Sequence, residues 1–473
     1  MNSNLLKKSS LVIAMSSFFL CSVAPVLAAS APTISLTPEA HNRDYVDVGR
    51  RVASSNSGKF LSVWSSKNDK DAAKTGIYGR YSGVAKAFRI QETAPPEALS
   101  LSMNDKQAVV AWVADRQVYA QPIAAGTTAN IAAEPVFVGS SDADSTVSVA
   151  TAASGDGAFA VVWRKGSIVW LRQFDKSGVA IADAQQVTSN CQTEKSTVDL
   201  EDVANSTSPP KSKPSSEALP CTPDVAMNSA GDTVVVVWDE NSNIYARSFK
   251  NGDAQNRVDV DATPADIISG KKLVDYSPLT PVVAINQAGD FVVAWSLERA
   301  SSTVKAAKVC FAKKDCVVET QYVPMLAASI VARGVSKTMT PAAQSFVVVK
   351  ELVKMDKTPQ ISMDASGNFA LVWSNVFLAK ENVAGLDNLL KEKSNVEAQK
   401  FSTDARGRIK GRAKVAVQKA TRMVGSPLNQ SPSVALAKDG SFLVVWDAGR
   451  FATPLSSSTN SAFFDVKQRF YVK

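Results

Sequence analysis

The chain has 473 residues and a formal net charge of +8, a mild basic excess that does not by itself imply nucleic acid as a partner. Although 45% of the residues are hydrophobic, no segment beyond the first 28 is long and apolar enough to cross a membrane. The only histidine, His41, precedes the repeated part of the chain, which disfavours catalysis by a Ser-His-Asp or Cys-His arrangement.

Residues 1–28 have the pattern of a secretory signal peptide. Lys7 and Lys8 give a positive start, an apolar stretch follows from Leu11 to Leu20, and the segment ends in Val26-Leu27-Ala28. Removing this segment takes away two lysines and leaves a formal charge of about +6. We therefore expect an exported protein without a membrane span, located in the periplasm, outside the cell or at the cell surface.

Residues 29–473 contain seven copies of one repeat, each ending in a tryptophan. The clearest copies read PVVAINQAGDFVVAW (Pro281 to Trp295), PQISMDASGNFALVW (Pro359 to Trp373) and PSVALAKDGSFLVVW (Pro432 to Trp446). Seven of the eight tryptophans of the chain occupy this one position: Trp64, Trp112, Trp163, Trp238, Trp295, Trp373 and Trp446. A recurring unit of this length is typical of a repeat architecture.

Each copy has the pattern of a four-stranded antiparallel sheet. A short apolar strand leads into a turn rich in Asn, Asp, Ser and Gly, and a continuously apolar strand such as FVVAW then indicates burial on both faces. A third strand alternates, as in Ile244–Phe249 and Val396–Phe401, and the weaker Val304–Val309 is expected to play the same part in the fifth copy. The fold class predicted is all-β, a seven-bladed β-propeller forming a single domain, with the tryptophans packed between blades.

The two ends of the repeat region predict how the ring closes. The last copy has a third strand near Asp465–Tyr471 and no fourth strand before Lys473. The segment Thr33–Thr37 lies ahead of the first copy and is extended in character. We expect it to supply the outer strand of the last blade, which would leave no open sheet edge.

The pattern resembles the short β-propeller repeats of bacterial secreted and surface proteins, whose units read roughly VAM, turn, GDFVVVW, loop, IYARRF. The clearest counterparts here are the copy from Pro223 to Trp238 and the strand IYARSF, Ile244–Phe249. The resemblance covers nearly all of residues 29–473. It implies the propeller architecture and no specific function, because such repeats serve adhesins, binding proteins and enzymes.

Insertions are expected at about residues 191–221, 317–357 and 374–395. Most long connections join strands two and three or successive blades, and these open on the same side of a propeller, hereafter the loop-rich face. Because loops on rigid scaffolds carry function, this face is the predicted interaction surface, although tolerated insertions explain the pattern equally well. The spacing of Leu386, Leu389 and Leu390 predicts a short amphipathic helix over Glu381–Lys393, and the Ser-, Pro- and Lys-rich insertion at 191–221 is expected to be flexible.

Four cysteines follow the signal segment: Cys191, Cys221, Cys310 and Cys316. An even number in an oxidising compartment favours two disulfides, and proximity favours Cys191–Cys221 and Cys310–Cys316 among the three possible pairings. The spacings lack a paired C-x-x-C pattern, so zinc is disfavoured, and we expect no metal and no cofactor.

Five cations alternate along a predicted outer strand and would share one face: Arg406, Arg408, Lys410, Arg412 and Lys414. Such a stripe suits a polyanion, whereas a solvated rim strand that resists aggregation explains the same residues. No aromatic residues are interleaved for base stacking, which argues against nucleic acid.

No catalytic residues are predicted. The chain lacks HExxH, GxSxG, phosphate-loop and EF-hand motifs. Carboxylates expected on the loop-rich face, Asp239, Glu240, Glu298 and Asp447, would support a glycosidase only at a defined separation. Three hypotheses remain: a monomeric, non-catalytic binding or scaffold propeller for a carbohydrate or protein, an enzyme that acts on polysaccharide, and a structural subunit of an envelope assembly.

Overall fold

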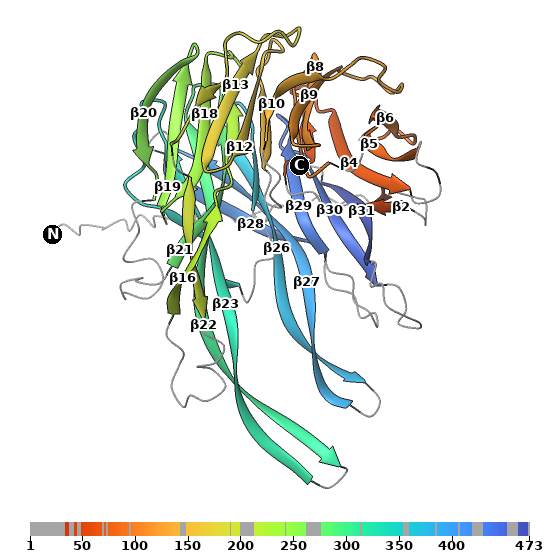
Figure 1. Cartoon of the computed structure of the whole chain (residues 1–473), viewed down its shortest axis with the longest axis vertical. Coiled ribbons are helices and arrows are strands. Elements are labelled where there is room, and N and C mark those ends of the chain that lie inside the picture. Colours follow the sequence, from red (N-terminus) through yellow and green to blue (C-terminus); the bar gives the residue numbers. More distant parts are fainter. Residues whose placement is uncertain are drawn as a thin grey trace, which may run out of the picture.

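Seven four-stranded antiparallel sheets surround a central axis in a computed structural model of the chain, shown in Figure 1. The predicted seven-bladed β-propeller is confirmed. The structure describes residues 34–36, 42–44, 49–68, 71, 74–93, 96–141, 148–189, 191–198, 212–241, 243–261, 276–312, 315–352, 359–383, 386–404, 407–418, 429–451 and 462–471. Within these residues, no helix has the length and apolar character needed to span a bilayer.

The blades follow one another along the chain, and each begins with its innermost strand. Blade 1 comprises β3 (Val52–Ser54), β4 (Phe60–Asn68), β5 (Gly76–Tyr81) and β6 (Phe88–Gln91), with β2 (Asn42–Asp44) paired to the end of β4. Blade 2 comprises β7 (Ala98–Met103), β8 (Gln107–Ala114), β9 (Gln117–Ala124) and β10 (Val136–Ser140). Blade 3 comprises β11 (Val149–Ala153), β12 (Phe159–Lys165), β13 (Ile168–Phe174) and β14 (Gln185–Gln186).

Blades 4 to 7 repeat this order. Blade 4 comprises β17 (Asp224–Met227), β18 (Thr233–Glu240), β19 (Asn243–Lys250) and β20 (Asp253–Asp259). Blade 5 comprises β21 (Tyr276–Ile285), β22 (Phe291–Ala312), β23 (Asp315–Val335) and β24 (Phe346–Leu352). Blade 6 comprises β25 (Gln360–Met363), β26 (Asn368–Val383), β27 (Leu386–Thr403) and β28 (Ile409–Gln418). Blade 7 comprises β29 (Asn429–Leu436), β30 (Phe442–Phe451), β31 (Ala462–Tyr471) and β1 (Ile34–Ser35).

The tight turn between the first two strands explains the glycine of the repeat. Gly231 and Gly367 have φ values of +76° and +84°, a conformation that side chains with a Cβ rarely adopt. In blade 2 the corresponding turn runs from Asn104 to Gln107, and neither of its two middle residues has a positive φ. Lys106 is therefore tolerated where the other copies carry glycine.

The seven repeat tryptophans are buried between blades. Each belongs to a different apolar cluster, and each cluster combines residues of two consecutive blades. Trp238, for example, packs with Val169 and Leu171 of blade 3, and Trp64 packs with Leu443 and Val445 of blade 7. The continuous apolar strands are thus needed on both faces, because each blade has a neighbour on either side.

A repeated arginine in the third strand also joins neighbouring blades. Nη1 of Arg172, Arg247 and Arg333 donates a hydrogen bond to a backbone carbonyl in or just beyond the fourth strand of the preceding blade. The acceptors are the carbonyl oxygens of Val138, Val187 and Val260, at 2.9, 2.7 and 2.7 Å. The IYAR motif therefore contains a connection between blades.

The N-terminal segment closes the ring, as the sequence predicts. In β1, Ile34 pairs with Gln468 and Ser35 pairs with Lys467, both on β31. Leu36, which follows, is buried in the cluster between blades 7 and 1. Antiparallel pairing by a distant segment gives blade 7 the outer strand that its own repeat lacks.

A buried ion pair lies at the same junction. Nη1 of Arg51 is 2.6 Å from Oδ1 of Asp447, and the two side chains are 0% and 1% exposed. Arg51 Nη2 also donates to the carbonyl of Ser431, and the Arg51 backbone amide donates to the Ser433 hydroxyl. Residues of blade 1 and blade 7 are therefore joined by charge as well as by apolar packing.

Two expectations about blade 5 are wrong. The third strand of blade 5 is formed by the end of β23, where Val331 pairs with Trp295, and Val304 instead pairs with Tyr322 in an extended hairpin. Residues 317–357 are therefore not a connection between blades, because β23 and β24 occupy most of them. The insertion lies within the β22–β23 hairpin, which Figure 1 shows extending far beyond the ring.

The predicted helix over Glu381–Lys393 is also not formed. These residues belong to the β26–β27 hairpin, in which the ladder continues from Trp373–Glu397 to Val383–Leu386. A short helix is marginal on its own, whereas an existing ladder satisfies the backbone groups of each residue added to it. The insertion at 191–221 contains a hairpin, formed by β15 (Gln192–Val198) and β16 (Ser212–Pro220), and its expected flexibility stays a prediction.

Candidate functional site

The central channel is narrow and is blocked by an arginine. The first strands of the blades line it with alanine, methionine and isoleucine side chains such as Ala152, Met227 and Ile361, leaving a cavity of about 150 Å³. Arg50 reaches across the channel from blade 1, and its Nη2 lies 3.2 Å from Oδ2 of Asp224 and 3.3 Å from the carbonyl oxygen of Val283. The channel therefore offers little room for a ligand at this level.

The carboxylate of Asp224 makes its contacts within the channel lining. Its Oδ2 accepts a hydrogen bond from the backbone amide of Val283 at 2.9 Å, in addition to its contact with Arg50. Burial raises the pKa of Asp224 above its ordinary value, and the nearby charge of Arg50 opposes that shift. The pair joins blade 1 to blade 4 across the axis.

Two of the carboxylates singled out from the sequence have structural partners near the channel and the ring junction. Asp447 is paired with Arg51, and Asp239 is buried and accepts a hydrogen bond from the backbone amide of Thr222 at 2.8 Å. The side chain of Glu298 lies outside those that the structure describes. In the described part of the chain, no three His, Cys, Asp or Glu residues are grouped to hold a metal ion.

A shared face for the five cations stays a prediction. Arg406 lies outside the described residues, and Arg408 precedes β28 and pairs with Asp404 at 2.7 Å. Within β28, Lys410 pairs with Ser402 whereas Lys414 pairs with Gln399. Three residues of β27 separate those partners, so the β27–β28 ladder shifts register between positions 410 and 414.

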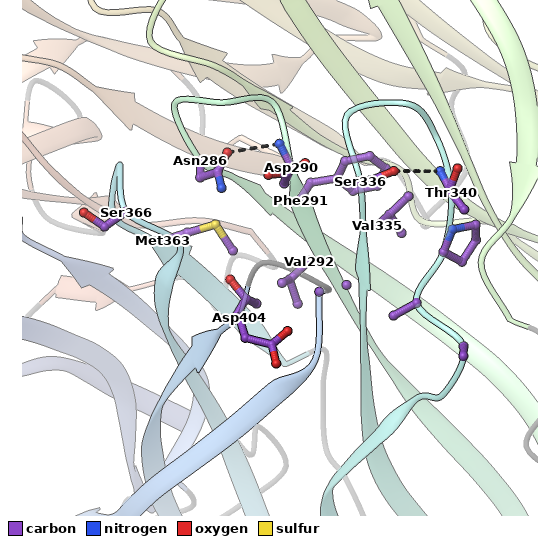
Figure 2. Close-up of a pocket in the computed structure, with 16 residues that line it drawn as sticks. Asn286, Asp290, Phe291, Val292, Val335, Ser336, Thr340, Met363, Ser366 and Asp404 are labelled. Carbon is purple, nitrogen blue, oxygen red and sulfur yellow. Dashed lines mark hydrogen bonds between the residues drawn. The ribbon is translucent and has the colours of Figure 1, made fainter.

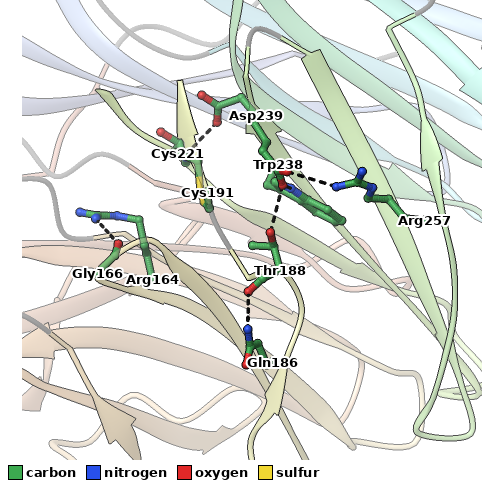
Figure 3. The surroundings of a disulfide bond; sticks show 11 residues. Arg164, Gly166, Gln186, Thr188, Cys191, Cys221, Trp238, Asp239 and Arg257 are labelled. Carbon is green, nitrogen blue, oxygen red and sulfur yellow. Dashed lines mark hydrogen bonds and ion pairs between the residues drawn. A yellow bond between two sulfur atoms is a disulfide. The ribbon is translucent and has the colours of Figure 1, made fainter. Parts of the chain in front are cut away.

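A pocket lies between blades 3 and 4 on the side of the loop-rich face. This interblade pocket has a volume of about 380 Å³ and is lined by Gln186, Val187, Thr188, Ser189, Trp238, Arg247 and Arg257. Figure 3 shows Thr188, Trp238 and Arg257 close together beside the Cys191–Cys221 disulfide. This disulfide confirms one predicted pairing. The backbone register also places Cys310 opposite Cys316, and a disulfide there stays a prediction.

Glu240 organises the polar wall of the interblade pocket. Its Oε2 accepts hydrogen bonds from Trp238 Nε1 at 2.9 Å and from Thr188 Oγ1 at 3.0 Å. Its Oε1 lies 3.2 Å from Nη1 of Arg257, whose guanidinium also lies over the Tyr245 ring at 4.2 Å from the centroid. Glu240 was among the carboxylates predicted on the loop-rich face, and the structure shows it holding an arginine in place.

The pocket carries an excess of positive charge. Arg247 and Arg257 are direct cross-strand partners in the β19–β20 ladder, an arrangement in which like charges repel. Burial lowers the pKa of the Arg247 guanidinium, the charge of Arg257 lowers it further, and the charge of Glu240 opposes both effects. The lining itself holds these two cations and no carboxylate, while Glu240 and Asp259 act on the charge of Arg257 from outside the lining.

A larger groove of about 420 Å³ lies on the opposite face, between the turns of blades 5 and 6. Figure 2 shows Asn286, Asp290, Ser336, Thr340 and Asp404 around it. Most of these polar groups stabilise their own turns. Asn286 accepts from the Asp290 amide, Ser336 accepts from the Thr340 amide, and Asp404 accepts from the Arg408 amide, each within 3.2 Å.

Comparison with known proteins gives similarity of fold at low identity. No protein-family profile and no curated protein sequence matches this chain. Among solved structures, the Dos1 propeller has a TM-score of 0.35 at 10% identity and 94% coverage of both chains. The GH93 α-L-arabinofuranosidase of Fusarium graminearum has a TM-score of 0.34 at 10% identity, covering 93% of this chain and 97% of that one. These likenesses assign no function to the chain.

Sequence reasoning did not find the interblade pocket. Thr188 comes from the connection between blades 3 and 4, and Arg257 comes from a fourth strand with little apolar pattern. The one available signal was Arg247, which belongs to the IYAR motif of the third strand. That motif indicates only the hydrogen bond to the preceding blade, which Arg172 and Arg333 make as well.

Proposed function

We propose that this chain is an exported, non-catalytic binding or scaffold propeller that recognises a carbohydrate or a protein on its loop-rich face. The observation that carries the proposal is that the candidate acids bind other groups of the protein. Asp239, Glu240 and Asp447 each hold a neighbouring group of the protein, whereas a general acid or a nucleophile must face the substrate. A rigid ring with an elaborated face suits recognition instead.

The shape of the loop-rich face supports binding of a large partner. The β22–β23 and β26–β27 hairpins of adjacent blades extend from the ring in a similar direction in Figure 1. The β15–β16 hairpin contacts β21 and β22, so it joins the same elaborated region. Export is supported by the signal-like segment and by a buried disulfide, a bond typical of oxidising compartments.

The experiment combines ligand discovery with selective blocking of one face. The protein lacking residues 1–28 is tested on a glycan array and by co-purification with envelope proteins, and released sugars are measured by mass spectrometry. A polymer is attached to a cysteine placed at Lys165, an exposed residue of the loop-rich face, or at Lys438, an exposed residue of the opposite face. We expect binding without product, blocked by the polymer at position 165 and retained with the polymer at position 438. Release of product, or the reverse pattern of blocking, would overturn the proposal.

A further inference from the structure

The interblade pocket differs from the equivalent junctions of other blades by a second arginine. The third-strand arginine that binds the preceding blade also occurs as Arg172 and Arg333, so Arg247 alone marks no site. In blade 4, the residue directly opposite it is Arg257, whose side chain is 43% exposed. Glu240 and the Tyr245 ring hold that guanidinium at the edge of an open pocket of about 380 Å³.

The donors of this pocket suit an oxoanion. A guanidinium presents five N–H donors in a planar fork that matches a carboxylate. Arg257 uses Nη1 for Glu240, and Arg247 uses Nη1 for the carbonyl oxygen of Val187. Because the lining holds two guanidinium groups and no carboxylate, and Arg257 is 43% exposed, a negatively charged group is the electrostatic complement of the pocket.

The remaining lining suits a polar ring such as a sugar. Gln186, Thr188 and Ser189 supply amide and hydroxyl groups, and the buried side chains of Trp238 and Val187 close the base of the pocket. The volume lies at the lower end of the range for small-ligand sites, which accommodates one sugar unit of a longer chain. The disulfide at Cys191–Cys221 fixes the segment that carries these polar groups, so the wall is built before a ligand arrives.

From this geometry we infer that the interblade pocket binds the carboxylate of an acidic sugar, a uronate unit of a polysaccharide, with Arg257 as the principal contact. The inference rests on the proposed function and adds the chemistry of the ligand. It places anion recognition at blades 3 and 4, away from the cation-rich strand β28.

The test measures binding of a trigalacturonate by calorimetry, with its fully methyl-esterified form as the neutral comparison. Arg257→Gln removes the principal contact. Arg89→Gln is the matched control, because Arg89 lies on the fourth strand of blade 1 and pairs with Glu92 at 2.9 Å, outside the pocket. We expect at least a tenfold loss of affinity for R257Q, a change of less than twofold for R89Q, at least tenfold weaker binding of the ester, and weaker binding at higher salt.

Three outcomes would overturn the inference: equal affinity for the acid and its ester, equal loss in R257Q and R89Q, or no binding of the acid. If the protein still binds a neutral glycan or a protein partner on its loop-rich face, the proposed function stands and the acidic-sugar inference alone fails. Thermal unfolding of both variants identifies a folding defect. If R257Q is unfolded, Arg257→Lys replaces it, and unchanged affinity in R257K contradicts recognition by a planar fork.

Discussion

The ion pair between Arg51 and Asp447 gives a quantitative test of how the ring is held closed. Both side chains are buried, at 0% and 1% exposed, and their closest atoms are 2.6 Å apart. Replacing Arg51 by Met keeps much of the side-chain volume but leaves the Asp447 carboxylate buried without its cation. Breaking a buried pair in this way costs about 3–5 kcal/mol, so the free energy of unfolding should fall by that amount in R51M.

The chain contains a matched control for this experiment. Arg408 and Asp404 form a pair of the same residue types at 2.7 Å, but their side chains are 67% and 25% exposed. Exposed pairs contribute about 0–1 kcal/mol, so R408M should lose no more than that. Urea unfolding at pH 7, followed by tryptophan fluorescence, measures both variants, since seven tryptophans lie between blades.

A double variant separates the loss of attraction from the burial of an unpaired charge. In R51M/D447L neither charge remains, and apolar replacement of a buried pair is often neutral or stabilising. We expect the double variant to recover most of the stability that R51M loses. The reasoning is refuted if R51M loses no more than R408M, or if the double variant is less stable than R51M.

Three further predictions concern the disulfide, the closing strand and a buried acid. The C191A/C221A variant should lose about 3–4 kcal/mol of unfolding free energy in urea, because the bond spans 30 residues of chain, and a loss below about 1 kcal/mol would contradict this estimate. Ser35→Pro should lower that free energy by about 1–2 kcal/mol relative to Ser35→Ala, because proline removes a donor from the β1–β31 pairing, and equal stability would count against closure by β1. Burial, reinforced by the charge of Asp259 and opposed by Arg333, raises the pKa of Asp261 from 3.8 to about 6. As the pH rises from about 4 to 6, the unfolded state releases this proton and the folded state retains it, so the free energy of unfolding falls over that window. D261N should therefore match the stability of the wild type at pH 4 and be about 2 kcal/mol more stable at pH 7. A difference in stability that is constant across pH would refute the assignment.

The architecture was predictable because every copy of the repeat carries the same physical requirements. A strand such as Val234–Trp238 is buried on both faces, and a blade inside a ring is the arrangement that provides two covering neighbours. The number of tryptophans at the repeat position gave the number of blades. The missing fourth strand after Tyr471 indicated that another segment had to close the last sheet, and β1 does so.

The long hairpins were harder to predict because nothing in their local pattern marks them as continuations of a blade. The leucines near position 389 have helical spacing, yet the ladder that begins at Trp373 continues through them. In blade 5, the segment Ile330–Val335 begins with the same I-x-A-R pattern as Ile244–Arg247. This pattern identifies the true third strand only when the copies of the repeat are aligned on their third-strand arginine. Long-range pairing thus overrode local propensity in both insertions.

The pocket could not be predicted because it depends on register between strands. Arg257 faces Arg247 only because the β19–β20 ladder shifts by a residue between Arg247 and Phe249. The same kind of shift occurs in the β27–β28 ladder between positions 410 and 414, although the alternation in sequence suggests regular pairing. A β-bulge exchanges the two faces of a strand, and no residue type in these segments marks its position.

The position of a residue within the repeat nevertheless indicates whether its side chain can contact a ligand. The residue directly after each repeat tryptophan is buried in all seven blades, whether it is small, apolar or charged: Ser65, Val113, Arg164, Asp239, Ser296, Ser374 and Asp447. Charge at that position therefore serves the fold, which explains the roles of Asp239 and Asp447. One position further on, Glu240 is partly exposed and already holds Arg257 at the pocket edge. Ligand-contacting residues in blade 4 should therefore be sought from Glu240 outward, on the third and fourth strands, and the Arg257 variants examine that region directly.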